Sequence, residues 1–193
     1  MARTPSTMLP LGTHAPGFRL ADFDGRMHAL EDFRDAPALL VAFVCNHCPF
    51  VRHLRTEFAA FAREYAPRGL AIVAINANDV EAYPQDGPDA MRQEAAELGY
   101  AFPYLIDASQ SVAKAYRAAC TPDFFLFDAA RRLVYRGQFD DSRPGNGRPV
   151  TGADLRAAAD ATLAGRAATA EQFPSLGCNI KWRRGNAPDY AAG

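Results

Sequence analysis

The sequence predicts an α/β protein with a central mixed sheet covered by helices on both faces. Residues 38–44 are seven consecutive apolar residues followed by a helical pattern, and residues 70–75 form a second apolar run after it. Residues 124–127 form a third run, and residues 133–135 pair back on it as a hairpin. Apolar runs rich in Val, Ile and Phe are typical of strands buried on both faces. A strand–helix–strand unit followed by an antiparallel hairpin therefore predicts a mixed sheet.

Length and composition suit a single domain. The chain has 193 residues, of which 49% are hydrophobic and 11% aromatic, which is ample for a packed core. We expect the core at about residues 37–165, an N-terminal extension at residues 1–36 and a C-terminal tail at residues 166–193.

The charge balance argues against two classes of partner. Lys plus Arg number 21 and Asp plus Glu number 22, so the net charge is −1. Without a basic excess, we expect no nucleic-acid partner and no anionic membrane surface. Residues 1–16 lack the charged start and apolar centre of a signal peptide, and no apolar stretch is long enough to span a bilayer. The expected location is the cytoplasm.

The N-terminal extension is expected to hold a β-hairpin. Asp24 and Gly25 separate two short mixed runs at residues 18–22 and 26–30. An Asp-Gly pair between such runs is a hairpin signal.

Helices are expected after the first two apolar runs. In the first helix, apolar residues recur at three- and four-residue steps and so mark one face of an amphipathic helix. These residues are Phe50, Val51, Leu54, Phe58, Phe61 and Tyr65. A second helix carries Met91, Ala95 and Leu98 and ends at Gly99. Residues 76–88 between them are polar, with Gly and Pro, and predict a loop.

The second half of the chain predicts smaller elements. Residues 104–107 suit a short extension or an edge strand, and residues 109–118 a helix. Residues 138–149 predict a loop. A closing helix is expected at residues 151–164, where Thr151 and Asp154 resemble a capping box. The tail from residue 172 shows no clear period.

The chemistry-bearing stretch follows the first predicted strand. Cys45 and Cys48 are separated by two residues at the exit of a strand and the start of a helix, which predicts a redox dithiol. A helix N-terminus lowers the pKa of a nearby thiolate. We therefore expect Cys45 to be an exposed attacking sulfur with a low pKa. Cys48, further in, would close the disulfide. His47 would tune the thiolate by its charge.

Several motifs together resemble a known family. The order of elements, the CxxC at a strand–helix junction and the later Thr121-Pro122 resemble the thioredoxin fold. The opening Gly12–Leu20, with Asp24-Gly25 after it, is similar to the branch that contains alkyl hydroperoxide reductase and thiol-specific antioxidant proteins (AhpC/TSA). Three motifs resemble a group of bacterial thioredoxin-like proteins within it: Cys-Asn-His-Cys-Pro at 45–49, Asp-Asp-Ser-Arg-Pro-Gly-Asn-Gly at 140–147 and Gly-Cys-Asn-Ile-Lys-Trp at 177–182.

The resemblance implies a thioredoxin fold with an N-terminal β-hairpin extension and a C-terminal tail. It also implies a thiol–disulfide oxidoreductase in which Cys45 is the nucleophile and Cys48 the resolving thiol. Pro122 is similar to the family's cis-proline, which with Thr121 would shape the groove for an extended substrate. The substrate would be a protein or small-molecule disulfide, with a separate reducing partner. No organic cofactor is implied, and no nucleotide-binding fingerprint is present.

Two departures from the family bear on the chemistry. A His directly before the second cysteine resembles oxidising disulfide catalysts and favours a more oxidising couple. The stretch 38–44 contains no acid, whereas thioredoxin keeps a buried acid on the strand before its motif. Proton handling on Cys48 would therefore fall to His47 or water.

Two alternative functions stay open. A peroxidase would have a Thr three residues before the reactive cysteine, but position 42 is Ala, so dithiol exchange is favoured. A copper or zinc carrier would use the same two sulfurs with a His.

The other two cysteines also leave alternatives. Cys120 and Cys178 are either buried small hydrophobic residues or a second redox pair that exchanges electrons with Cys45.

Overall fold

A seven-stranded mixed sheet forms the centre of the computed structural model, which describes residues 3–191. Its strand order is β3-β2-β6-β5-β4-β8-β9. The strands are β2 (Arg19–Asp22), β3 (Met27–Ala29), β4 (Ala38–Phe43), β5 (Leu70–Asn76), β6 (Tyr104–Ile106), β8 (Asp123–Phe127) and β9 (Leu133–Gly137). Strand β4 pairs parallel with β5 and antiparallel with β8, which confirms the predicted mixed sheet.

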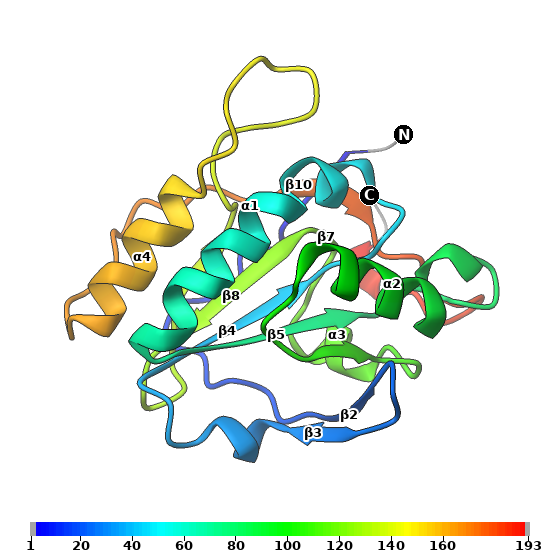
Figure 1. Ribbon diagram of the computed structural model, residues 1–193, viewed down its shortest axis with the longest axis horizontal. Coiled ribbons are helices and arrows are strands. Elements are labelled where there is room, and N and C mark those ends of the chain that lie inside the picture. Colours follow the sequence, from blue (N-terminus) through cyan, green and yellow to red (C-terminus); the bar gives the residue numbers. More distant parts are fainter. Residues whose placement is uncertain (1–2, 192–193) are drawn as a thin grey trace.

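Helices cover both faces of this sheet (Figure 1). The α-helices are α1 (Pro49–Tyr65), α2 (Pro88–Leu98), α3 (Ser111–Ala115) and α4 (Ala153–Leu163). Short 3-10 turns are η1 (Leu30–Phe33), η2 (Ala66–Arg68), η3 (Pro84–Asp86) and η4 (Asp189–Ala191). Helices α1, α2 and α4 contribute to one apolar cluster and α3 to the other. None of the helices within residues 3–191 is long and apolar enough to cross a membrane.

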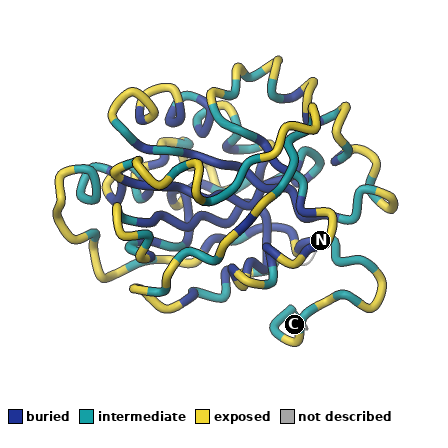
Figure 2. Tube along the Cα trace, turned by 90° about the horizontal axis from the view of Figure 1, so that it is seen from below, coloured by how far each residue is buried: buried dark blue, intermediate teal, exposed yellow. Residues whose placement is uncertain are grey.

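Strand β4 is buried along its whole length because both of its faces are covered. Figure 2 shows buried segments gathered in the middle of the molecule, with exposed segments around them. Leu40 and Ala42 belong to the cluster beneath α1, whereas Leu39 and Val41 belong to the cluster on the opposite face. This alternation follows from the two-residue period of a strand. An uninterrupted apolar run was therefore the right signal for the central strand.

The N-terminal hairpin is part of the main sheet. Strands β2 and β3 pair with each other, and Gly25 takes the positive φ of +83° that their turn requires. Strand β2 also pairs with β6, which pairs with β5 on its other side. The expectation of an edge strand at residues 104–107 was therefore wrong, because the hairpin occupies the edge.

Two predicted helices are shorter in the structure than predicted. Helix α3 covers only Ser111–Ala115, after Gln110 in a left-handed conformation. Helix α4 begins at Ala153 with Gly152 as its N-cap, so Thr151 does not form the expected capping box. Gly152 has a φ of +67°, and a Cβ there would lie 2.5 Å from the ring of Phe139. The helix start is held instead by the carboxylate of Asp140, which accepts the backbone N–H groups of Thr151 and Gly152 at 2.6 Å each.

The C-terminal tail contains a strand that the sequence did not predict. Strand β10 (Leu176–Asn179) lies between β1 (Thr4–Pro5) and β7 (Cys120–Thr121) in a separate three-stranded sheet. Ser6 stabilises this small sheet through two hydrogen bonds. Its hydroxyl donates to Asp123 Oδ1 at 2.8 Å and accepts from the Ser175 N–H at 2.8 Å. Beyond β10, Ile180 and Trp182 pack against the apolar cluster on the α3 face. The tail is thus joined to the domain on both sides of Cys178.

Candidate active site

The CxxC motif lies at the predicted strand–helix junction. Strand β4 ends at Phe43 and α1 begins at Pro49, so Cys45 lies in the connection between them. Cys48 is the N-cap residue of α1, with extended φ and ψ of −65° and 123°. Pro49 occupies the first helical position, where a missing N–H costs little. Of the two cysteines, Cys48 is therefore the one nearest to the positive end of the helix dipole.

Both sulfurs of the motif are enclosed. Cys45 and Cys48 are each 0% exposed, so the expectation of a solvent-exposed Cys45 was wrong. Residue Thr121 covers them. Its hydroxyl oxygen lies 3.4 Å from Cys45 Sγ, and its carbonyl oxygen lies 3.1 Å from Cys48 Sγ. The reason for the error is the unpredicted strand β10, which packs over Thr121 and closes this side of the motif.

The pKa values of the two cysteines are displaced in opposite directions. The pKa of Cys48 is lowered, mainly by its contacts with Cys178 and Cys45. The pKa of Cys45 is raised, because its thiol interacts with Cys48, is buried and lies near the carboxylate of Asp86. The direction at Cys45 is the opposite of the expected one.

His47 is engaged with an acid that the sequence analysis did not single out. Its Nδ1 lies 2.5 Å from Oδ2 of Asp86, and its ring stacks on Tyr83 with 5.4 Å between ring centroids. Asp86 is 0% exposed and also accepts the backbone N–H groups of Asn46 and His47, at 2.9 and 3.0 Å. The carboxylate therefore fixes the turn between the two cysteines. That His47 tunes the thiolate stays a prediction.

Asp86 supplies the buried acid that residues 38–44 lack. It belongs to η3, within the stretch that the sequence analysis predicted as a loop. The amide of Asn78 donates to its Oδ2 at 2.8 Å and so helps to hold it. Nothing local in the sequence separates Asp86 from the other acids of this stretch, because its role depends on a contact 40 residues away in the chain.

Thr121 and Pro122 lie where the resemblance predicts. The peptide bond between them is cis, and it connects β7 to β8. Because both polar contacts to the sulfurs come from Thr121, this residue joins the motif to β7.

The predicted pair of Cys120 and Cys178 is contradicted by the strand register. Cys178 lies opposite Thr121, and Cys120 lies opposite Asn179. Directly opposed residues of an antiparallel pair point to the same face, and consecutive residues point to opposite faces. Cys178 therefore shares the face of Thr121 and the motif, whereas Cys120 points away and its thiol contacts the Pro122 carbonyl at 3.6 Å. Cys178 is thus a neighbour of Cys48, and all four cysteines are free thiols.

One group of potential metal ligands surrounds Cys45. Within residues 3–191, Cys45, His47 and Asp86 offer donor atoms that lie within 4.8 Å of one another. Asp86 already accepts four donors, and its short contact with His47 occupies the ring nitrogen that faces it. This polar network explains the cluster without an ion.

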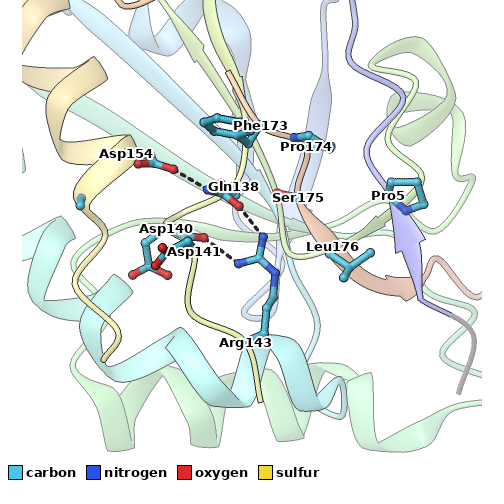
Figure 3. Close-up of a pocket in the computed structure, with 11 residues that line it drawn as sticks. Pro5, Gln138, Asp140, Asp141, Arg143, Asp154, Phe173, Pro174, Ser175 and Leu176 are labelled. Carbon is cyan, nitrogen blue, oxygen red and sulfur yellow. Dashed lines mark hydrogen bonds between the residues drawn. The ribbon is translucent and has the colours of Figure 1, made fainter. Parts of the chain in front are cut away.

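A cavity of about 570 Å³ lies beside the tail strand (Figure 3). Leu176 of β10 and Phe173 line one side, and the side chains of Gln138, Asp140 and Arg143 line the other. Asp140, Asp141 and Arg143 of the loop predicted at residues 138–149 thus form part of the cavity wall. None of the four cysteines lines this cavity.

Comparisons with known proteins agree with this geometry. Residues 11–136 match the sequence model of the AhpC/TSA family. The thiol-disulfide oxidoreductase ResA of Geobacillus thermodenitrificans is 30% identical over 128 residues, which cover 65% of this chain and 67% of that protein.

Solved structures extend the similarity to nearly the whole chain. A hypothetical protein from Sinorhizobium meliloti 1021 has a TM-score of 0.93 and 59% identity, covering 94% of this chain and 100% of the other. An uncharacterised conserved protein from Geobacillus kaustophilus has a TM-score of 0.92 and 54% identity, covering 95% and 97%. The thioredoxin domain of a Bacteroides vulgatus thiol-disulfide oxidoreductase, at 19% identity and a TM-score of 0.56, covers 67% of this chain and 89% of its own, and it shares the fold. The predicted thioredoxin fold is therefore confirmed.

Proposed function

Because the chain belongs to the AhpC/TSA family, we propose that it is a thiol–disulfide oxidoreductase whose redox pair is Cys45 and Cys48. The observation that carries the proposal is the placement of both sulfurs against Thr121, at the junction of β4 and α1. Two interacting sulfurs at the start of a helix suit thiol exchange, because each can reach the other to form a disulfide.

The first step joins Cys45 to the substrate. The Cys45 sulfur attacks one sulfur of a substrate disulfide, and its proton goes to the substrate sulfur that leaves. A bond forms between Cys45 and the substrate, the substrate disulfide breaks, and its other half leaves as a thiol. Cys48 stays beside Cys45, with its thiol donating to the Thr121 carbonyl at 3.1 Å.

The second step closes the Cys45–Cys48 disulfide. The Cys48 sulfur attacks the Cys45 sulfur, and the bond between Cys45 and the substrate breaks. The second substrate sulfur leaves and takes the proton of Cys48. One disulfide has been reduced to two thiols, and the enzyme needs a reducing partner to return to its dithiol form.

The proposal is tested by insulin reduction with dithiothreitol as the electron source. The wild-type chain is expected to accelerate the reaction, and Cys45→Ser to lower the rate strongly, because the sulfur that attacks the insulin disulfide is absent. Cys120→Ser is the matched control, since its sulfur points away from the motif. A Cys45→Ser chain that keeps the wild-type rate would remove Cys45 from the mechanism.

Peroxide reduction is the second candidate, and one contact favours it. Position 42 is Ala, but the Thr121 hydroxyl lies 3.4 Å from Cys45 Sγ and could donate to a peroxide oxygen there. The same preparations, assayed with hydrogen peroxide in place of insulin, separate the two activities. We expect peroxide to oxidise Cys45 at a rate close to that of a free thiol. A rate far above that value would make the protein a peroxidase.

A further inference from the structure

Cys178 faces the redox motif from the tail. The register places it opposite Thr121, so its side chain lies on the face where the Thr121 hydroxyl meets Cys45. Cys45, Cys48 and Cys178 belong to the same buried cluster. A third thiol, which the two-cysteine mechanism does not use, therefore lies beside the motif.

The contacts of Cys48 place it between the other two sulfurs. The thiols of both Cys45 and Cys178 are positioned to donate to the Cys48 sulfur. The Thr121 carbonyl, which Cys48 Sγ contacts at 3.1 Å, belongs to the residue paired with Cys178. Cys48 thus has both Cys45 and Cys178 as neighbours.

The tail is packed tightly enough to hold Cys178 there. A Cβ built on Gly177 would lie 2.0 Å from the Thr121 carbonyl oxygen and 3.2 Å from the Pro122 nitrogen. Only a glycine lets β10 approach Thr121 and Pro122 so closely. Cys178 is 4% exposed, whereas Cys45 and Cys48 are 0% exposed, so Cys178 is the one of the three that reaches the surface.

We propose that Cys178 is a third redox-active residue, which exchanges with the Cys45–Cys48 disulfide to give a Cys48–Cys178 disulfide. The inference rests on the proposed function for the source of that disulfide. The Cys178 thiolate attacks Cys48 Sγ, the bond between Cys48 and Cys178 forms, and the bond between Cys45 and Cys48 breaks. The electron pair goes to Cys45, which takes up the proton that Cys178 lost. No external oxidant is required.

The exchange moves the disulfide from an enclosed pair to the tail strand. Cys45 becomes a free thiol again, and the oxidised bond now includes Cys178, the one residue of the three that is not fully buried. A reducing thiol can then attack Cys178, which restores all three thiols after a second exchange. The tail strand is thus the route by which reducing equivalents reach the buried motif.

The test is disulfide mapping of the Cys45→Ser chain. This chain is incubated with glutathione disulfide as oxidant, its free thiols are alkylated, and its peptides are identified by mass spectrometry. We expect a peptide cross-linked through Cys48 and Cys178, with both residues lost from the alkylated pool. The balance is one glutathione disulfide consumed and two glutathione thiols released. Cys120 is expected to stay alkylated.

Two further chains separate the outcomes. In Cys178→Ser the Cys45–Cys48 disulfide is expected, and in the double variant Cys45→Ser/Cys178→Ser no internal disulfide is expected. If Cys178→Ser forms its disulfide while Cys178 stays free in Cys45→Ser, the third redox residue is refuted and the proposed function stands. If neither single variant forms a disulfide, both proposals fall. Circular dichroism of each chain identifies any that fails to fold, and such a chain is replaced by the corresponding Ala variant.

Discussion

Asp123 shows what burial does to a single carboxyl group beside the site. It is 0% exposed, accepts one hydrogen bond from the Ser6 hydroxyl at 2.8 Å and leaves Oδ2 without a partner. Burial raises the pKa of Asp123 to about 7 from its ordinary value of 3.8. The folded protein therefore holds a proton that the unfolded chain releases at lower pH.

This shift makes stability depend on pH in a defined direction. Because the folded pKa is the higher one, the stabilising contribution is complete below about pH 4 and is lost as pH rises to about 7. The loss is at most about 4 kcal/mol over this interval, at about 1.4 kcal/mol per pH unit. Asp123→Asn, which can still accept from Ser6, is expected to flatten this part of the profile. Urea unfolding at about pH 5 and pH 8 measures it, and equal slopes for wild type and variant would contradict the assignment.

Other residue roles could be predicted only in part from the sequence. The spacing of Cys45 and Cys48 at the end of an apolar run located the motif, because strand, motif and helix are contiguous in the chain. The direction of the pKa shift at Cys45 was not predicted. It depends on contacts with Cys48 and Asp86, and the shift at Cys48 depends on Cys178, which reaches the motif from a distant segment.

At the scale of elements, β10 determines access to the site. It has four residues, and its pairing with β7 links residues more than fifty positions apart in the chain. A short strand whose partners are distant carries no local apolar period, so the sequence could not predict it. The long apolar strands β4 and β5 and the helix α1 were predictable, because the buried apolar residues of each element lie within one continuous stretch of sequence.

A substitution at Gly177 tests the role of this strand. Gly177→Ala places a methyl group 2.0 Å from the Thr121 carbonyl oxygen, so β10 must move away from Thr121 and Pro122. We expect the free energy of unfolding to fall by about 1–3 kcal/mol and the alkylation rate of Cys45 and Cys48 to rise. Gly17→Ala is the matched control, since a Cβ there meets nothing within 4 Å. Unchanged alkylation in Gly177→Ala would mean that β10 does not limit access.

At the scale of the whole molecule, both ends of the described chain converge on one site. Strands β1 and β10 come from opposite ends of the sequence and form one small sheet with β7. The central sheet positions the CxxC, and the small sheet covers it. The fold class, the sheet and its helical layers followed from the sequence, but the closed site did not, because closure requires the two ends to meet.

The central claim is that Cys45 and Cys48 act as one two-electron redox pair, and a thiol redox titration tests it most directly. The Cys178→Ser chain is equilibrated in glutathione buffers of increasing oxidation, quenched with acid, alkylated and analysed residue by residue. The account predicts that Cys45 and Cys48 lose their alkylation together along a single two-electron curve, with a direct bond between them. Oxidation of the two sulfurs at separate potentials, as independent glutathione adducts, would contradict it.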